Sequence, residues 1–487
     1  MWWLEPPNAL PAWQRATTAV APDRELRVPP LSRFPLPGGQ VALVDSDTGG
    51  WCVTDDVEAG LLTEGRRFSN AIGSAWTTQA WRRGLLRDGD RHVLGDADLA
   101  GEAAACRDTY GLVLLLNGGC NLVCTYCYLG HETPSKKRMI DLSLAEEAIR
   151  SALQRPEEQI IVDLGEIAVS NPHWRHLATY TREVAASSPG EVRLTVQTNG
   201  TTLDQSSVDF LAQHEVTVGL SLDGPARHHD RARMFRTGAG SHELAVRALE
   251  RCAKTGVSTH LIATVARHNV AVPELVVGEL LSHRPGSYLL KPVLAHGEAA
   301  TAWDREGVTS DEYASFMERA IRAAVESGGA LDQSAAKFAQ RLLGERRGWA
   351  DGCTSRQCGS GRSLHVVASD GEVFACPRFV TGGTGFRPPG RLSLPLLLAD
   401  SLRAVPESCA GCPWLRSCGG GCTLSGHDGT RGTVPLPDPQ CTAYQVMHEV
   451  LLRQVIAPAA LGADGLVNGR VKRCSVRPDH LIESESR

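Results

Sequence analysis

The chain has 487 residues, of which 42% are hydrophobic and 22% are charged, and this balance excludes a disordered protein. Its 50 lysines and arginines against 55 acidic residues give a formal charge of −5, so no overall positive charge attracts nucleic acid or an anionic membrane. No apolar run reaches the roughly 20 residues of a membrane-spanning helix, and the first residues lack the pattern of a signal peptide. We therefore expect a cytoplasmic protein without a nucleic-acid or membrane partner.

Residues 1–105 form the first expected unit, a small α+β domain. Val41–Asp45 and Trp51–Thr54 have the composition of two short strands around a turn of Ser, Asp, Thr and Gly, and a helical pattern begins at Asp55. The accessible edge of such a hairpin can bind a peptide as an additional strand. A simple packing role for this unit is an equally good interpretation.

From residue 111 onward, short apolar strands alternate with amphipathic helices. The expected strands are residues 111–116, 159–164, 192–198, 217–222, 258–265 and 287–293, and the last helix covers residues 311–328. This alternation requires parallel strands joined by right-handed crossovers. Six such units predict an α/β fold, a partial (β/α)6 barrel over residues 106–345, with its functional residues at the carboxyl ends of the strands.

A cysteine-rich loop follows the first expected strand. Cys120, Cys124 and Cys127 have the spacing C-x3-C-x2-C, with Tyr126 inside the motif and no fourth cysteine close by. Three thiolates on a four-iron cluster leave one iron without a protein ligand, where a small molecule can bind. A zinc site or simply buried cysteines are the alternatives that the spacing alone leaves open.

The ends of the following strands carry glycine and polar residues. They are Gly165, Glu166, Asn199, Ser221 and Asp223, with Arg233 in the next segment. Together with the cysteine loop, these segments resemble the motifs of the radical SAM enzymes, which cleave S-adenosylmethionine reductively to a 5′-deoxyadenosyl radical. The resemblance implies that Cys120, Cys124 and Cys127 are catalytic and hold the cleaving cluster, and that Tyr126, Gly165, Glu166, Asn199, Ser221, Asp223 and Arg233 bind the cofactor. Leu164 and Ile167 depart from the Gly-Gly-Glu-Pro pattern of that family, so backbone contacts of this loop are not implied.

Eight further cysteines lie in residues 346–445, which are followed by a helix and a polar tail over residues 446–487. This region resembles the SPASM extension of radical SAM enzymes that modify peptides and proteins. The resemblance assigns Cys353, Cys358, Cys376 and Cys422 to auxiliary cluster I, and Cys409, Cys412, Cys418 and Cys441 to auxiliary cluster II. A pair of zinc ribbons is the alternative, because C-x2-C spacing also suits tetrahedral zinc.

The resemblance implies an oxidoreductase with three [4Fe-4S] clusters, one that binds S-adenosylmethionine and two auxiliary ones, and an electron donor such as flavodoxin or ferredoxin. Its expected substrate is a ribosomally made precursor peptide whose leader binds a winged-helix-like unit in residues 1–105, and its expected product is a cross-link between side chains. Formylglycine formation is a weaker alternative, because Pro377 follows Cys376 where the sulfatase-maturing branch has an aspartate as proposed base. The cysteine pattern also leaves open a non-enzymatic zinc protein and an iron–sulfur electron-transfer protein, and the sequence does not indicate the catalytic base.

Overall fold

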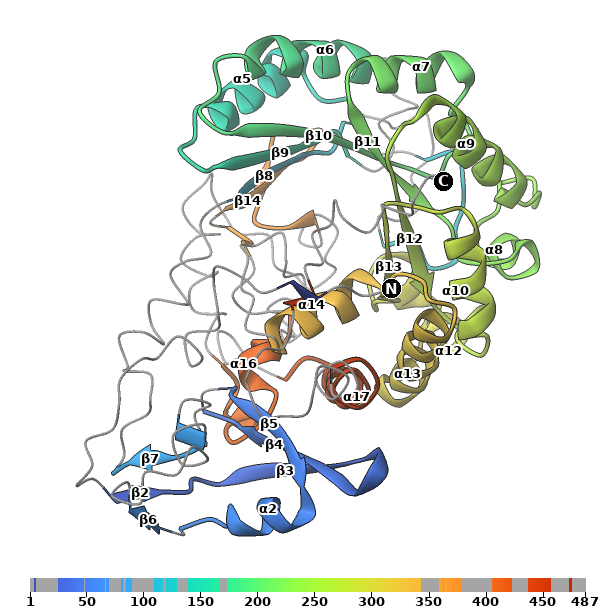
Figure 1. The fold of residues 1–487 in the computed structure, drawn as a ribbon. Helices are drawn as coiled ribbons and strands as arrows, with labels where there is room; N and C mark the ends of the chain where they lie inside the picture. Colours follow the sequence, from blue (N-terminus) through green and yellow to red (C-terminus); the bar gives the residue numbers. More distant parts are fainter. Residues whose placement is uncertain are drawn as a thin grey trace, which may run out of the picture.

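The computed structural model describes residues 4–5, 25–47, 49–65, 67–69, 80–81, 85–89, 109–116, 120–128, 139–165, 173–342, 359–361, 363–377, 405–422, 437–456 and 473–474. Within these ranges, an eight-stranded sheet with helices on its outer side forms the larger part of the molecule, and two three-stranded antiparallel sheets lie apart from it (Figure 1). No helix among the described residues is long and apolar enough to cross a membrane.

Six parallel strands of the large sheet follow one another in chain order. They are β8 (Thr109–Leu114), β9 (Gln159–Asp163), β10 (Glu191–Thr198), β11 (Val216–Ser221), β12 (Thr259–Val265) and β13 (Ser287–Pro292). Each strand pairs in parallel with the one before it, so the strand order in space equals the order in the chain. The six α/β units expected from the sequence are confirmed, with nearly the same strand bounds.

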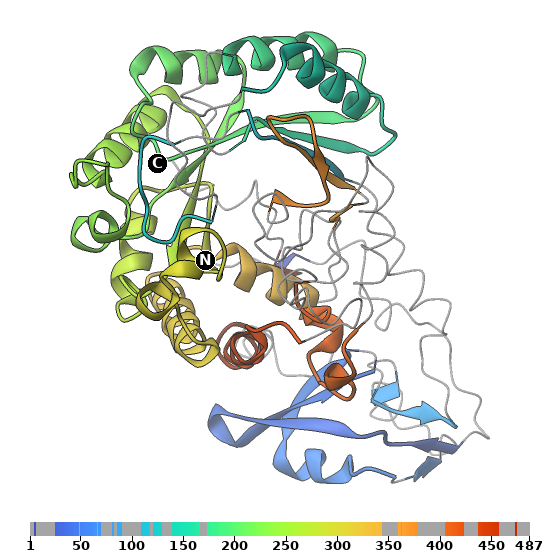
Figure 2. The same ribbon diagram turned by 180° about the vertical axis from the view of Figure 1, so that it is seen from behind.

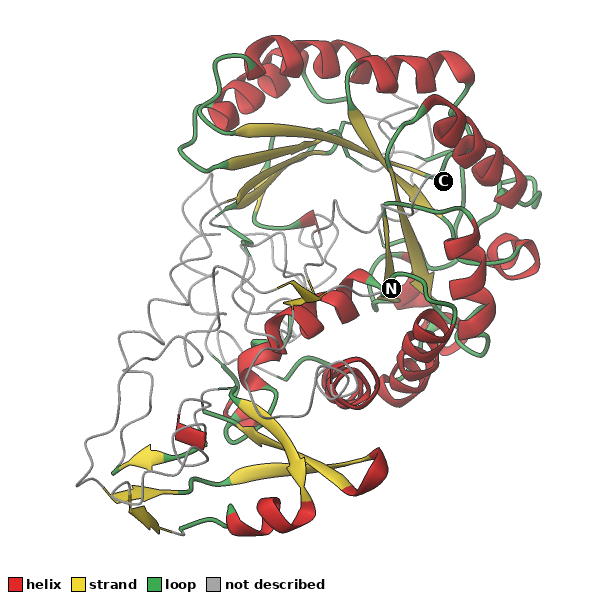
Figure 3. Ribbon diagram, viewed as in Figure 1, coloured by secondary structure: helices red, strands yellow, loops and turns green. Residues whose placement is uncertain are grey.

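Amphipathic helices connect the strands and cover the convex side of the sheet (Figure 3). They are α5 (Leu142–Leu153), α6 (Trp174–Ala185), α7 (Gln205–Gln213), α8 (Ala226–Ala232), α9 (His242–Thr255) and α10 (Pro273–Ser282). Aspartate side chains fix where two of them begin, because Asp141 and Asp204 accept hydrogen bonds from the first turns of α5 and α7.

Alternation along the strands separates the core from the concave side. In β12, Leu261, Ala263 and Val265 are buried and belong to the same apolar core as Val276 and Leu280 of α10. Successive side chains of a strand point to opposite faces, so the partly exposed residues between them face the concave side. The sheet therefore presents its less buried residues to the interior of the open barrel.

Segments after the six units cover both edges of the large sheet. At one edge, β14 (Leu364–Val367) adds in parallel to β8, and β15 (Val373–Phe374) pairs antiparallel with β14. At the other edge, the buried carboxylate of Asp332 accepts a hydrogen bond from the Leu290 amide (2.8 Å), and the Tyr313 hydroxyl donates to the Leu290 carbonyl (2.8 Å). The addition of β14 and β15 to the sheet was not expected from the sequence.

Among the described residues, four helices lie between β13 and β14, and two more belong to the carboxyl-terminal part. They are α11 (Glu298–Thr301), α12 (Trp303–Glu306), α13 (Ser310–Glu326), α14 (Gln333–Leu342), α16 (Leu415–Cys418) and α17 (Cys441–Leu451), which continues as a π-helix over Leu452–Ile456. Helix α17 packs against both α13 and α14 (Figure 2). The long helix expected over residues 311–328 is confirmed as α13, which begins with a capping box of Thr309 and Glu312.

The amino-terminal part contains the expected hairpin. β4 (Gln40–Asp45) and β5 (Trp51–Asp55) pair antiparallel, and α2 (Asp56–Leu61) follows β5. β3 (Leu31–Leu36) adds to the other side of β4, so that β3 is an edge strand of a sheet with three described strands. In a second sheet, β2 (Glu25–Arg27) lies between β6 (Arg67–Ser69) and β7 (Arg87–Asp88). A separate two-stranded sheet pairs β1 (Leu4–Glu5) with β16 (Arg473–Cys474).

Both faces of the sheet β3-β4-β5 contribute to a core. Val44 and Trp51 belong to the large core that includes the barrel, whereas Leu43 and Cys52 belong to a separate amino-terminal core. The indole N–H of Trp51 donates a hydrogen bond to the carbonyl of Leu342 at the end of α14 (2.7 Å). The amino-terminal sheet is therefore packed onto the rest of the molecule.

Candidate functional site

The three-cysteine loop lies at the carboxyl end of β8, beside the segment that follows α8. The amide of Val123 donates a hydrogen bond to the Met234 carbonyl (2.8 Å), and the amide of Thr125 donates to the Ala232 carbonyl (3.0 Å). An isolated antiparallel bridge between Leu122 and residue 235 continues this pairing. The backbone of the loop is thus fixed independently of any ligand.

The three thiols of this loop differ in burial. Cys124 is buried, whereas Cys120 and Cys127 are partly exposed. Burial raises the pKa of the Cys124 thiol to about 12, and the nearby Arg233 guanidinium acts in the opposite direction. A thiolate at Cys124 therefore needs the positive charge of a bound metal.

Asn199, at the end of β10, contacts the cysteine loop directly. Its side-chain amide donates a hydrogen bond to the side-chain oxygen of Asn121 (3.0 Å) and lies 3.5 Å from the Sγ of Cys120. The Asn121 amide donates in turn to the Thr201 hydroxyl (2.8 Å). The polar residues after β10 therefore hold the first part of the cysteine loop.

Tyr126, Asp223 and Arg233 form a buried polar network with the loop. The Tyr126 hydroxyl donates to Oδ2 of Asp223, and Nε of Arg233 donates to the same oxygen (2.9 Å). The other carboxylate oxygen accepts a hydrogen bond from the Thr264 amide at the end of β12 (2.9 Å). Burial alone would raise the pKa of Asp223, but the Arg233 guanidinium holds it well below its usual value, so the carboxylate is ionised. The network joins the cysteine loop to the ends of β11 and β12.

Two histidines that the sequence analysis did not single out complete this network. The ring of His268 stacks on Tyr126 with 5.5 Å between the ring centres, and its Nε2 lies 3.3 Å from Oδ2 of Asp223. Nδ1 of His229 accepts a hydrogen bond from the Asp223 amide (3.2 Å), so its Nε2 carries the proton directed at Ser241 (3.0 Å). Burial lowers the pKa of His229 to about 3, which keeps this ring neutral. His268 lies three residues after the end of β12, and this position after a parallel strand is the sequence signal that could have identified it as a site residue.

Of the remaining residues that were expected to bind the cofactor, the structure describes Gly165 and Ser221. Gly165 follows β9 with φ of 82°, and a Cβ at this position would lie 2.3 Å from the Leu114 carbonyl oxygen, so only glycine fits there. Ser221 ends β11 and is partly exposed. Glu166 lies outside the described residues.

The loop after β13 also contacts the cysteine loop. The amide of Glu298 donates a hydrogen bond to the Cys127 carbonyl (2.9 Å). Gly297 has φ of 55°, and a Cβ there would lie 2.4 Å from the same carbonyl oxygen. The backbone of this loop therefore closes on the third cysteine, and Gly297, which the sequence analysis did not single out, allows this close approach.

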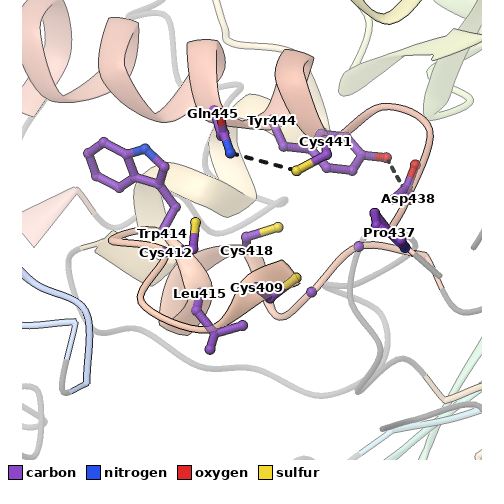
Figure 4. A pocket seen from close by; sticks show the side chains of 12 residues that line it. Cys409, Cys412, Trp414, Leu415, Cys418, Pro437, Asp438, Cys441, Tyr444 and Gln445 are labelled. Atoms are coloured by element: carbon purple, nitrogen blue, oxygen red, sulfur yellow. Dashed lines mark hydrogen bonds between the residues drawn. The ribbon is translucent and has the colours of Figure 1, made fainter. Parts of the chain in front are cut away.

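A second group of cysteines lines one pocket between α17 and the preceding cysteine-rich segment (Figure 4). It consists of Cys409, Cys412, Cys418 and Cys441, the four that the resemblance assigned to auxiliary cluster II. Burial raises the pKa of the Cys441 thiol, and the neighbouring thiols of Cys409 and Cys412 raise it further. Trp414 and Tyr444 contribute aromatic surface to the same pocket.

The other expected set of cysteines is described only in part. Cys376 and Cys422 are partly exposed, and Cys353 and Cys358 lie outside the described residues. The amide of Cys422 donates a hydrogen bond to the buried carboxylate of Asp438 (2.6 Å), and Asp438 also lines the four-cysteine pocket. This aspartate links the two expected sets, and its position three residues before Cys441 was the signal that the sequence analysis missed.

The donor sets of both sites suit iron–sulfur clusters. Across the described ranges, no three His, Cys, Asp or Glu side chains are grouped so as to hold a single metal ion. A four-iron cluster takes each thiolate on a different iron, so its ligands do not converge on one point. The donors here are soft thiols, which select iron–sulfur clusters or zinc over hard cations.

Comparison with known proteins gives a family match over part of this site. Residues 114–272 match the model of the Radical SAM superfamily. An uncharacterized protein of Synechocystis is 30% identical over 165 residues, a match that covers 32% of this chain and 40% of that protein. The mycofactocin maturase MftC of Mycobacterium ulcerans is 28% identical, over 67% of this chain and 86% of the relative. The serine-type anaerobic sulfatase-maturating enzyme of Klebsiella aerogenes is 23% identical, over 62% of this chain and 76% of that enzyme.

Two solved structures share the fold at low sequence identity. The anaerobic sulfatase-maturating enzyme anSMEcpe, with bound AdoMet and the Cp18Cys peptide, has a TM-score of 0.57 and 20% identity, and covers 72% of this chain and 98% of its own. Streptococcus suis SuiB bound to the precursor peptide SuiA has a TM-score of 0.52 and 14% identity. The match covers 84% of this chain and 100% of the SuiB chain. These likenesses support the α/β architecture alone. The superfamily match spans the cysteine loop and the ends of β9, β10, β11 and β12.

Proposed function

We propose that this chain is a radical SAM peptide maturase that oxidatively modifies a ribosomally made precursor peptide, by cross-linking its side chains. The observation that carries the proposal is the fixed three-cysteine loop at the carboxyl ends of the parallel strands, in a chain that also has a separate four-cysteine pocket. Relatives named as a mycofactocin maturase and a structure named as SuiB with its precursor peptide support the choice of a peptide substrate.

In this proposal, Cys120, Cys124 and Cys127 hold a [4Fe-4S] cluster with one iron open to the cofactor. With S-adenosylmethionine bound, such a cluster supplies the electron that releases a 5′-deoxyadenosyl radical. Glu166 is assigned to the ammonium group of the cofactor, because a carboxylate pairs well with a cation. Arg233 is assigned to its carboxylate, since the hydrogen bond to Asp223 uses only Nε and the terminal nitrogens can donate to a second anion.

The contacts within the protein distinguish residues that bind from residues that position. Asp223 is fully buried and its carboxylate already accepts hydrogen bonds from Tyr126, Arg233 and the Thr264 amide, so we assign it to orienting Arg233. Tyr126 is held by the same carboxylate and by His268, so its ring is fixed beside the cluster loop. Asn199 is assigned to the loop and the cofactor together, because it already holds Asn121. Ser221 ends the neighbouring strand and remains assigned to the cofactor.

The cysteine-rich region is proposed to hold two auxiliary [4Fe-4S] clusters. Cys409, Cys412, Cys418 and Cys441 line one pocket and form the donor set of auxiliary cluster II. Cys353, Cys358, Cys376 and Cys422 remain the proposed donors of auxiliary cluster I. Fully ligated clusters of this kind supply electron transfer, which the oxidation of a peptide requires. A flavodoxin or ferredoxin is the proposed donor of the first electron.

The amino-terminal sheet is the proposed binding site for the leader of the precursor peptide. Among the described strands, β3 lies at the edge of its sheet, and Arg33 and Pro35 on it are exposed. An unpaired strand edge offers backbone donors and acceptors that an extended peptide can use as an additional strand. The winged-helix-like character expected from the sequence is consistent with a hairpin followed by a helix.

The decisive experiment is co-expression of the enzyme with a short peptide encoded beside its gene, under low oxygen, followed by tandem mass spectrometry. Loss of two hydrogens, with missing fragmentation between two residues, is the expected result for a cross-link. A variant with Cys120, Cys124 and Cys127 all replaced by Ala is the control, and it should leave the peptide unchanged. If the wild-type protein forms no 5′-deoxyadenosine with S-adenosylmethionine and a reductant, the proposal is wrong.

Formylglycine formation is the second candidate function. It is favoured by relatives and a solved structure that are named as anaerobic sulfatase-maturating enzymes. Pro377 after Cys376 argues against it, because proline has no side chain that can accept a proton. Incubation with a sulfatase-type peptide containing Ser or Cys distinguishes the two, since formylglycine yields an aldehyde that reacts with hydrazides and a cross-link does not.

A further inference from the structure

The amino-terminal sheet packs directly behind the four-cysteine pocket. The ring of Phe34 on β3 lies 4.7 Å from the ring of Trp414, measured between centres. Trp414 lines the pocket and is only 2% exposed. The Trp414 ring also stacks on His448 of α17, at 5.2 Å. Trp414 is therefore held between β3 and the helix that begins at Cys441.

The turn of the β4-β5 hairpin provides a second, independent contact with the same region. Nε of Arg416 in α16 donates a hydrogen bond to the Asp47 carbonyl (2.5 Å). Gly49 allows this approach, because a Cβ at its position would lie 2.8 Å from the Cβ of Arg416. The buried Arg87 pairs with Asp45 (2.8 Å) and also with Asp47 (3.3 Å), which fixes the turn. The hairpin thus rests on the short helix that ends at Cys418.

Trp414 is tied to the backbone of the cysteines on both sides of it. The amide of Cys418 donates a hydrogen bond to the Trp414 carbonyl (2.6 Å), and the amide of Leu415 donates to the Cys412 carbonyl (3.1 Å). A change in the position of the Trp414 ring therefore reaches two of the four thiols through these turns. The contact between Phe34 and Trp414 could not be predicted from the sequence, because the two residues lie far apart in the chain.

We propose that Phe34 is a positioning residue for the four-cysteine site and acts through Trp414. The amino-terminal sheet keeps Trp414 against the pocket and excludes water from the side of the thiols. This inference rests on the proposed function, in which the pocket holds an iron–sulfur cluster. β3 is also the edge strand proposed for the leader, so the strand that binds the peptide is the strand that supports the cluster.

The proposal predicts a direction for the reduction potential of that cluster. The apolar shell of a metal site controls solvent access, and solvent access in turn tunes the potential. Removing the Phe34 ring opens space behind Trp414 and admits water. Reduction adds a negative charge, which water stabilises, so the potential is expected to shift to more positive values and the bound iron to be lost more readily.

The test uses the full chain with the three cysteines of the radical SAM loop, and also Cys353 and Cys358, replaced by Ala, so that neither the cleaving cluster nor the proposed auxiliary cluster I contributes a signal. Three variants are compared in this background: Phe34→Ala, Phe34→Leu and, as a matched control, Phe210→Ala. Phe210 is also partly buried and packs on Trp174 (5.2 Å) at the outer helices of the barrel. After anaerobic reconstitution, iron per chain is measured, and a redox titration is followed by electron paramagnetic resonance.

The expected result is a positive shift and faster iron loss in Phe34→Ala, a smaller shift in the same direction in Phe34→Leu, and wild-type values in Phe210→Ala. Wild-type iron content and potential in Phe34→Ala overturn the proposal, as does an equal shift in the Phe210→Ala control. If Phe34→Ala does not fold, the comparison of Phe34→Leu with Phe210→Ala decides in the same way. A parent protein that binds no iron in this background refutes auxiliary cluster II itself, which separates failure of the proposed function from failure of this inference.

Discussion

Replacing Asp223 with Asn is expected to destabilise the segment that holds the cysteine loop by about 3–5 kcal/mol, the usual cost of breaking a buried ion pair. The carboxylate of Asp223 is fully buried, and the side chain of Arg233, 2.9 Å away, is only 10% exposed. Asn retains an oxygen for the Thr264 amide but leaves the guanidinium as an uncompensated buried charge. Replacing Arg233 with Met at the same time removes that charge, so the double variant should lose much less than the sum of the two single variants.

Hydrogen exchange of the cluster-free protein, followed by mass spectrometry, measures this effect where it occurs. Amides in residues 120–128 and 222–235 should exchange faster in Asp223→Asn by roughly two to three and a half orders of magnitude, at about 1.36 kcal/mol for each factor of ten. Glu274→Gln is the control, because its pair with Arg319 is about half exposed and should contribute at most about 1 kcal/mol. Additive effects of the two single changes, or a loss below about 1 kcal/mol for Asp223→Asn, would refute the network as the support of the loop.

Three further outcomes are expected. Burial lowers the pKa of His448 from 6.5 to about 3. Below about pH 6.5, His448 is therefore protonated in the unfolded chain but stays neutral in the folded one. The free energy of unfolding consequently decreases as pH falls below about 6.5, by about 2 kcal/mol at pH 5. His448→Phe should lack this loss in urea unfolding of the cluster-free protein at pH 7 and 5, and an equal loss in both proteins contradicts it. Gly165→Ala places a methyl group against the Leu114 carbonyl, so 5′-deoxyadenosine formation should fall at least tenfold while circular dichroism stays unchanged; wild-type turnover would show that the contact is unimportant. Replacing Cys409 and Cys412 with Ala should preserve cofactor cleavage but suppress peptide modification, and product formation at the normal rate argues against electron transfer at that pocket.

The strands and the order of the site segments could be predicted because the signals are local. In β12, the alternation of Leu261, Ala263 and Val265 with less buried residues is visible in the sequence as a strand. The cysteine loop and Asn199 follow such strands, and parallel strands bring their carboxyl ends to one side of the sheet. In the structure Asn199 lies at hydrogen-bond distance from Asn121 of the loop, while its expected contact with the cofactor stays a prediction.

The contacts within the site could not be predicted, because they depend on partners far away in the sequence. Asp223 was expected to contact the cofactor, and its hydrogen bonds within the protein lead us to propose that it orients Arg233. The structure shows that its carboxylate accepts a hydrogen bond from the hydroxyl of Tyr126, which lies 97 residues earlier in the chain. The pairing of β14 with β8 and the contact of Phe34 with Trp414 likewise join distant segments that show no local signal for each other.

The late cover of the two sheet edges has a consequence for how the protein is made. On the ribosome, β8 to β13 emerge before Asp332 and β14, so the nascent sheet presents two bare strand edges until the cysteine-rich region has been synthesised. Bare edges template the pairing of one chain with another, and non-local strand pairing is slow to form. A chain truncated before Asp332 keeps all six parallel strands, yet aggregation is its expected first defect, ahead of any loss of cofactor.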